Sequence, residues 1–101
     1  MPATIVREGE RTLAFRDISP TAPTHVLVIP REHHPDVAAL VAADPDLLVE
    51  VVREATAVAH AEGIAATGYR LVANTGRDGH QSVQHVHLHV LGGRAMSWPP
   101  G

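Results

Sequence analysis

The amino-acid sequence predicts an α+β domain: a five-stranded, mainly antiparallel sheet covered on one side by one long helix and one short helix. Two observations predict this class. One long amphipathic segment spans residues 44–63, and short apolar runs rich in β-branched residues precede and follow it. A length of 101 residues provides for one hydrophobic core, so we expect a single domain over residues 1–101.

The first strands are expected before residue 31. Residues 4–9 (TIVREG) and 12–17 (TLAFRD) are short, half-alternating apolar runs, which predict a hairpin. The loop 18–23 contains two prolines. Residues 24–30 (THVLVIP) are rich in β-branched residues and predict a buried strand that stops at Pro30.

A polar turn over residues 31–36 and a short helix over 36–42 should follow. The long helix has clear end signals, with Asp44 as N-cap, Pro45 in the first helical position and Gly63 as its stop. Its apolar residues recur at helical spacing on one face: Leu47, Leu48, Val51, Val52, Ala55, Val58 and Ala59.

The last two strands are expected at residues 68–74 (GYRLVAN) and 82–92 (SVQHVHLHVLG), joined by a glycine-rich loop over 75–81. The final strand carries three histidines at alternating positions, so they should share one face of the sheet: His85, His87 and His89. The opposite face would carry Val86, Leu88 and Val90 under the helix.

Composition excludes several kinds of chemistry. The chain has no cysteine and no lysine, so it has no disulfide, thiolate zinc site, cysteine nucleophile or Schiff base. A net charge of −3 and three aromatic residues argue against nucleic acid as a partner. No stretch resembles a membrane span or a signal peptide, so we expect a soluble cytoplasmic protein with no membrane partner.

The alternating histidines admit three interpretations. A solvated face is unattractive, since surface strands normally carry Thr, Lys, Arg or Glu. Zinc often binds two such histidines and a third ligand, here His33 or His34. However, no carboxylate lies beside the triplet in the sequence to orient metal-bound imidazoles, and a row of side chains does not converge on one point.

The third interpretation is chemistry at phosphorus, for which imidazole serves as nucleophile, acid or phosphate ligand. A linear row suits the in-line arrangement of nucleophile, phosphorus and leaving group, and no metal is needed. Backbone, amide and hydroxyl donors beside the row support it: Asn74, Gly76, Gly79 and Ser82. His25 and His60 are assigned to structural or surface roles, and His34, which precedes Pro35, to the turn.

The stretch HVHLHVLGGR at residues 85–94, preceded by GHQS and followed by WPPG, resembles the signature of the histidine triad (HIT) superfamily. It is most similar to the Hint branch, the purine nucleotide phosphoramidases. Residues 13–33 (LAFRDISPTAPTHVLVIPREH) and the C-terminal part from Gly68 onwards are similar too, so the resemblance covers nearly the whole chain. The tail LGGRAMSWPPG fits the dinucleoside polyphosphate hydrolase branch less well.

This resemblance implies a homodimer whose two sheets join into one, and metal-independent, cofactor-free hydrolysis of AMP-amine or GMP-amine conjugates. His87 would form a nucleotidyl-histidine intermediate. The implied helpers are His89 at the phosphate, His85 beside His87, and His33 near the leaving group. The implied substrate contacts are Asn74 and Ser82 at the phosphate or leaving group, Asp17 at the ribose, Phe15 and Ile18 at the base, and Trp98 towards the partner's site.

Three departures from the branch bear on substrate choice. The chain begins almost directly at the first hairpin, which leaves the expected base pocket more open. His80 stands beside the active loop where the branch usually has glycine, and Arg16 replaces the histidine that commonly precedes the ribose aspartate. Two other functions remain open: a nucleotide-binding or interaction module with weak catalysis, and a histidine metalloprotein.

Overall fold

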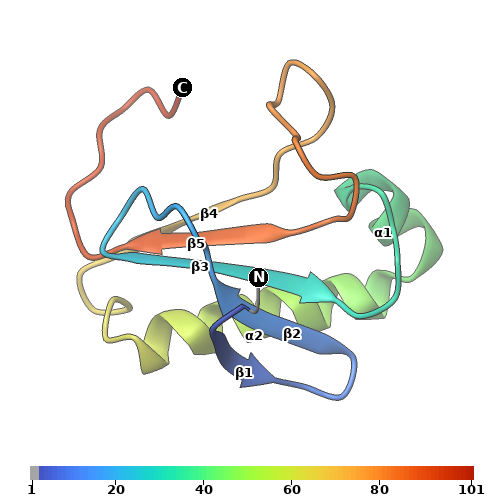
Figure 1. The fold of residues 1–101 in the computed structure, drawn as a ribbon, viewed down its shortest axis with the longest axis horizontal. Helices are drawn as coiled ribbons and strands as arrows, with labels where there is room; N and C mark the ends of the chain where they lie inside the picture. Colours follow the sequence, from blue (N-terminus) through green and yellow to red (C-terminus); the bar gives the residue numbers. More distant parts are fainter. Residues whose placement is uncertain (1–2) are drawn as a thin grey trace.

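A computed structural model describes residues 3–101, in which five strands and two helices follow the predicted order (Figure 1). The strands are β1 (Ile5–Glu8), β2 (Thr12–Arg16), β3 (Thr24–Pro30), β4 (Tyr69–Val72) and β5 (Leu88–Gly92). The helices are α1 (Val37–Ala43) and α2 (Pro45–Ala61). All strand pairs are antiparallel in the order β1-β2-β3-β5-β4, which confirms the predicted α+β class.

One face of the sheet packs against the helices. Side chains alternate between faces along a strand, so Val26, Val28 and Val90 point together toward α2 and are fully buried. Leu40 of α1 belongs to the same core, whose other members come mainly from α2. Phe15, Leu27 and His89 are cross-strand neighbours on the opposite face, which the helices leave uncovered.

The predicted end signals of α2 are confirmed. The carboxylate of Asp44 accepts a hydrogen bond from the backbone N–H of Leu47 at 3.1 Å, and Pro45 takes the first helical position. Gly63 follows the helix with a φ of 76°, a conformation that glycine adopts without strain. The buried stripe is narrower than predicted, because Val52 stays 39 % exposed on the outer face.

The predicted last strand over residues 82–92 is wrong in its first half, because β5 begins only at Leu88. The ladder between β3 and β5 ends at the pair Val28–Leu88, although β3 itself continues to Pro30 in its pairing with β2. Within the described structure, residues 82–87 make no ladder pair with a strand. Val86 nevertheless points into the core, so the predicted sidedness of its neighbours is retained.

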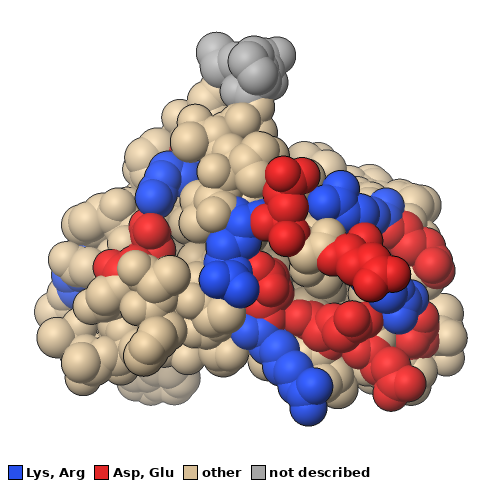
Figure 2. All heavy atoms as spheres, turned by 90° about the horizontal axis from the view of Figure 1, so that it is seen from below, with Lys and Arg blue, Asp and Glu red and all other residues tan. Residues whose placement is uncertain are grey.

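Salt bridges fasten the hairpin to the outer surface of α2. Figure 2 shows this region, where arginine and carboxylate side chains lie interleaved. The paired atoms lie 2.6 to 2.7 Å apart in Arg7–Glu54, Arg11–Asp44 and Arg16–Glu62. The hydrogen bond from Arg11 holds the pKa of the Asp44 carboxyl below its usual value, and the Leu47 N–H lowers it further. Such exposed pairs stabilise modestly and weaken in salt.

Neither helix in the described part of the chain combines the length and apolar character needed to cross a membrane.

Removal of the side chain that docks α1 should weaken the fold. Leu40 is fully buried, and Leu40→Ala leaves a cavity that should lower the free energy of unfolding by about 3 kcal/mol. Val41→Ala is the matched control, because Val41 is 43 % exposed and should change stability by less than about 0.5 kcal/mol. Urea denaturation of both variants measures the difference, and equal losses would show that α1 is not held through Leu40.

Candidate functional site

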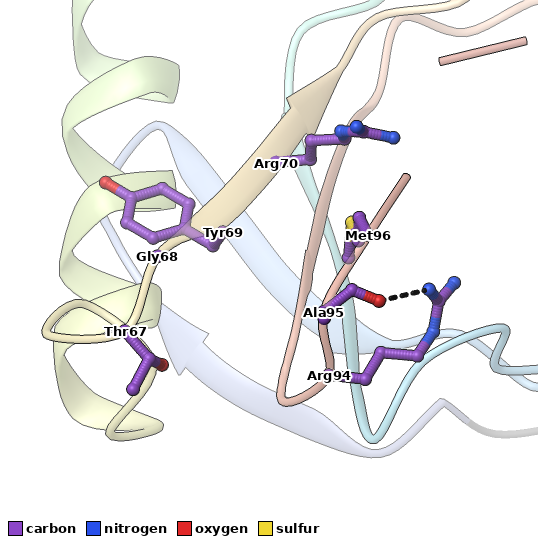
Figure 3. Close-up of a pocket in the computed structure, with 7 residues that line it drawn as sticks. All are labelled: Thr67, Gly68, Tyr69, Arg70, Arg94, Ala95 and Met96. Carbon is purple, nitrogen blue, oxygen red and sulfur yellow. Dashed lines mark hydrogen bonds between the residues drawn. The ribbon is translucent and has the colours of Figure 1, made fainter. Parts of the chain in front are cut away.

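One cavity lies away from the histidines, between the start of β4 and the segment that follows β5 (Figure 3). Its volume is about 250 Å³. The Arg94 guanidinium donates to the carbonyls of Ala95 and Thr21, while Arg70 donates to that of Ser97. Within the described residues its lining contains no imidazole or carboxylate. This cavity therefore lacks the groups expected of the active site.

A second hollow, here called the apolar groove, runs along the uncovered face of the sheet. It consists of two cavities of about 260 and 450 Å³ that share Phe15, Leu27 and Val83. The first is also lined by His85 and His87. The second extends to Asp17 and Ile18. The groove thus joins a pair of imidazoles to a carboxylate through an apolar floor, as small-molecule sites commonly do.

Strand register explains this arrangement. Leu27 in β3 faces Phe15 in β2 on one side and His89 in β5 on the other, so the three side chains share a face. Arg16 belongs to the opposite face, where its guanidinium binds both carboxylate oxygens of Glu62, at 2.7 and 3.1 Å. Arg16, which replaces the histidine expected before the ribose aspartate, therefore points toward α2.

His85 is held by the turn over residues 31–36. Its Nε2 lies 2.9 Å from the carbonyl oxygen of Pro30, which can only accept, so the ring carries its proton there. Its Nδ1 then accepts in the neutral ring. The Nδ1 of His33, 3.0 Å away, is therefore the donor, and the Nε2 of neutral His33 is left with a lone pair.

His87 has the opposite proton arrangement from His85. Its Nδ1 lies 2.8 Å from the carbonyl oxygen of His85, so the Nδ1 must carry the proton. The Nε2 of neutral His87 then presents a lone pair. Since His87 lines the groove, this ring is the one equipped to act as a nucleophile or base.

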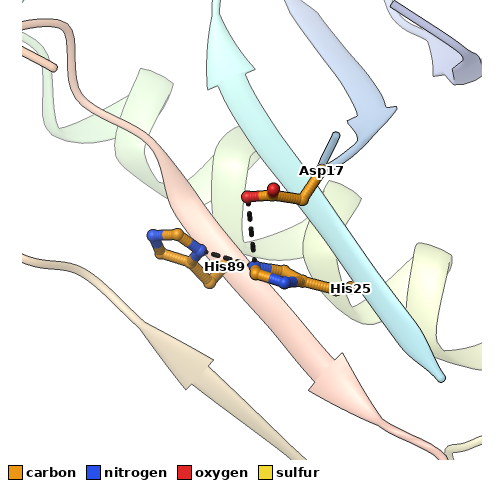
Figure 4. Close-up of side chains that lie close together, drawn as sticks. All are labelled: Asp17, His25 and His89. Carbon is orange, nitrogen blue, oxygen red and sulfur yellow. Dashed lines mark hydrogen bonds and ion pairs between the residues drawn. The ribbon is translucent and has the colours of Figure 1, made fainter. Parts of the chain in front are cut away.

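His89 and His25 lie side by side on neighbouring strands, with Asp17 next to His25 (Figure 4). The backbone N–H of Thr21 donates to the Nδ1 of His25 at 3.1 Å, which leaves the His25 proton on Nε2. That Nε2 lies 2.9 Å from the Nδ1 of His89 and 3.5 Å from a carboxylate oxygen of Asp17. His89 accepts through Nδ1, so its own proton lies on Nε2.

The Nε2 of His89 is buried and has no hydrogen-bond partner among the described residues. Burial lowers the pKa of His89, and the charges of His87 and His25 lower it further. His89 is therefore neutral near pH 7 and offers an N–H group. Its ring centre lies 5.0 Å from that of His87, so a ring with an unprotonated Nε2 and a ring with an Nε2–H adjoin each other.

Of the structural and surface roles assigned to His25, burial excludes the surface role. His25 is buried within the histidine cluster, and Asp17 supplies the carboxylate that the residues adjoining the triplet lack. Sequence reasoning missed this group because its members come from three separate segments. The available signal was alternation on β3, which places His25 on the same face as Leu27.

Asp17, His25 and His89 could be read as a metal site, because one ligand atom of each lies within 4.8 Å of the others. The hydrogen bonds argue against this. Thr21 occupies the lone pair of His25 Nδ1, so the nitrogen facing the other two residues bears a proton. A cation there would have to displace that proton and break the Thr21 bond. The three residues are therefore better arranged to share the Nε2 proton of His25 than to bind a metal ion.

The remaining predicted residues lie around this centre. Asn74 follows β4, two residues after Val72, whose partner in β5 is His89. Ser82 opens the segment that leads to His85. Gly79 and His80 lie in the exposed loop, where His80 has a φ of 62° that is strained for a non-glycine residue. Trp98 is 81 % exposed in the C-terminal segment and lines neither part of the groove.

Comparison with known proteins gives a consistent result. The HIT domain family model matches residues 1–96. A 14 kDa zinc-binding protein of Zea mays is 47 % identical over all of this chain and 80 % of its own length. A HIT family hydrolase of Legionella pneumophila is 50 % identical, with a TM-score of 0.95 over all of this chain and 90 % of that one.

A hypothetical histidine triad nucleotide-binding protein of Sulfolobus tokodaii is 29 % identical and has a TM-score of 0.78. That match covers 99 % of this chain and 66 % of the other.

The proton positions can be measured by NMR. Long-range ¹H–¹⁵N spectra at pH 7.5 should show neutral His87 protonated on Nδ1 and neutral His89 on Nε2. On titration, His89 should take up its proton at a lower pH than the ordinary histidine pKa of about 6.5, because its pKa is lowered by burial.

The same shift affects stability. Below the ordinary histidine pKa of about 6.5 the unfolded chain binds more protons at this position, so His89 destabilises the fold as the pH falls. His89→Gln should therefore lose less stability than the parent between pH 7.5 and 5.5. An equal loss of stability in the two proteins contradicts the lowered pKa of His89. An Nδ1 proton on neutral His89 contradicts the hydrogen-bond assignment.

Proposed function

Because this chain belongs to the HIT domain family and has the fold of HIT family hydrolases, we propose that it hydrolyses purine nucleoside phosphoramidates. The substrate would be AMP or GMP joined to an amine through a P–N bond. The observation that carries the proposal is the opposite proton arrangement of the adjoining rings of His87, which lines the groove with a lone pair on Nε2, and His89, which has an Nε2–H without a partner among the described residues.

His87 attacks the phosphorus through Nε2. A nitrogen–phosphorus bond forms, the bond to the amine breaks, and the amine leaves as it gains a proton. The Nδ1 of His87 keeps its proton and its hydrogen bond to the carbonyl oxygen of His85, which stabilises the positive charge that the ring acquires. Water then attacks the nucleotidyl-histidine, which releases AMP or GMP and restores the free imidazole.

His89 donates a hydrogen bond from its Nε2–H to a phosphate oxygen; because this nitrogen is buried in the free protein, the substrate displaces the contacts that cover it. A neutral ring suits this role because the donor is available without a second positive charge beside His87. His25 keeps His89 in the donor form by donating to its other nitrogen. His33, exposed and bonded to His85 through Nδ1, supplies the proton to the departing amine from Nε2 when its ring is in the imidazolium form, and returns to the neutral ring.

The apolar groove receives the base, with Phe15 and Ile18 at its sides. Asp17 binds the ribose hydroxyls through its carboxylate, whose Oδ1 also accepts from the backbone N–H of Ser19 at 2.8 Å and whose Oδ2 lies 3.5 Å from His25 Nε2. Asn74 and Ser82 hold phosphate oxygens or the leaving group, with Gly79 and His80 in the loop beside them. No metal or organic cofactor takes part in this scheme.

We also propose that the sheet continues across a homodimer through β4. The sheet has two edges, and β1 is the protected one, because its pairing with β2 is interrupted by an irregularity at Val6 and it carries Arg7 and Glu8. The register of β4 is uninterrupted and all four of its residues are only half-buried. A partner at this edge would bring the exposed Trp98 of one chain near the site of the other.

Turnover is the direct test of the function. Adenosine 5′-phosphoramidate should release AMP and ammonia, equally with and without EDTA, because His87 is a nucleophile that needs no metal. His87→Ala should lower kcat by about 10³-fold or more. His60→Ala on the solvent face of α2 is the control. Full activity of His87→Ala defeats the mechanism, and tight AMP binding without turnover indicates a binding module.

The dimer is tested by light scattering coupled to size-exclusion chromatography. The expected mass is about twice the 10.8 kDa of one chain, because β4 offers unpaired backbone groups. A mass of one chain across the micromolar range excludes the continuous sheet. Salt should change the result little, since the contact consists of backbone hydrogen bonds and apolar area.

A further inference from the structure

The segment of residues 81–87 is attached to the turn over 31–36 by side chains and single backbone bonds instead of a ladder. The Val86 N–H donates to the carbonyl of His34 at 2.8 Å, close to the bonds that hold the His85 ring. At the other end of the segment, the Gln81 Nε2 donates to the carbonyl of Pro35 at 2.6 Å. Gln81 is thus the anchor of the end that leads into Ser82.

The Gln81 amide binds three backbone groups at once. Besides its bond to Pro35, its Nε2 donates to the carbonyl of Val83 at 3.0 Å, and its Oε1 accepts from the N–H of Gly76 at 3.0 Å. The backbone N–H of Gln81 also donates to the carbonyl of Gly76 at 3.0 Å. One side chain therefore joins the loop 75–81, the turn 31–36 and the segment that follows.

The requirement for glutamine follows from this pattern. Two donors and one acceptor at the end of a three-carbon stem match the three backbone groups, and no other side chain of that length provides both kinds. Glutamate would place a carboxylate oxygen against the carbonyls of Pro35 and Val83. Methionine has the length and would leave all three groups without their partner.

The loop itself is crowded, so it depends on such a fastening. A Cβ at Gly79 would lie 2.4 Å from the carbonyl oxygen of Thr75, which shows how tightly the chain turns there. His80, immediately before Gln81, has the left-handed φ of 62°. A conformation of this kind persists only where its surroundings hold it.

We propose that Gln81 is a positioning residue for the reaction, acting through Ser82. It fixes the backbone on both sides of Ser82, through its own N–H and through the carbonyl of Val83, and so places the serine hydroxyl where it meets the transferred phosphate. This inference rests on the proposed phosphoramidase function. Gln81 itself stays bonded to backbone groups and contacts no substrate atom.

A double-mutant cycle tests the route through Ser82. Gln81→Met should lower kcat for adenosine 5′-phosphoramidate about tenfold or more and raise KM less than about threefold, because misplacement affects the transition state most. In a Ser82→Ala background the same change should lower kcat by less than about twofold. Fully additive losses overturn the proposal, since a general structural role would add to the Ser82 effect.

Gln84→Met is the matched control, because Gln84 lies in the same segment and its amide makes one longer bond, 3.2 Å, to the carbonyl of Gln81. It should leave kcat within about twofold of the parent.

Amide hydrogen exchange of the free protein separates this inference from the proposed function. Exchange at residues 75–84 should rise in Gln81→Met and stay unchanged in Gln84→Met, whether or not the protein turns over. Unchanged exchange in Gln81→Met refutes the anchor. Absence of phosphoramidate turnover in the parent protein with raised exchange in Gln81→Met refutes the function and leaves the anchor standing.

Discussion

The site depends on the hydrogen bonds that continue from β3 to the segment before β5 after the sheet has ended. The last ladder pair is Val28–Leu88, and two residues later the chain leaves the sheet at Pro30. From there the bonds of His85, Val86 and Gln81 to the turn over 31–36 replace the ladder. This exchange frees His87 from strand pairing and lets its ring lie in the groove.

The two faces of the sheet divide stability from chemistry. Valines on one face meet α2, and the salt bridges of Arg7, Arg11 and Arg16 hold the hairpin to the same helix. The other face collects Phe15 and Leu27 beside the imidazoles. Successive side chains on a strand point to opposite faces, so one residue packs in the core and the next lines the groove.

Much of the fold could be predicted from local patterns. The caps at Asp44 and Gly63 define α2, and β-branched runs define the strands, since both signals lie within a few residues. The end of β5 was not predictable in this way. A run such as residues 82–92 has the right alternation throughout, and only the position of β3 decides where pairing stops.

The site was predictable to the extent that its residues are consecutive. Alternation alone singled out His85, His87 and His89, while the family resemblance supplied their expected roles and that of His33. His25 and Asp17 became neighbours of His89 through the register of three strands, which no short stretch records. The pairing of Arg16 with Glu62 was likewise unpredictable, because the two residues are distant in the sequence. The sequence alone did not reveal the register between distant strands, which brings these residues together.

The groups that decide the proton positions are main-chain atoms: the N–H of Thr21 and the carbonyls of Pro30 and His85. Every amino acid carries a carbonyl, and every one except proline carries an N–H. Substitution of a side chain at these positions therefore leaves the hydrogen bonds that fix the imidazole protons unchanged, as long as the backbone keeps its conformation and the imidazoles remain. The backbone conformation thus determines which nitrogen of each imidazole carries the proton. The flanking side chains can therefore change without altering the acid–base character of the site.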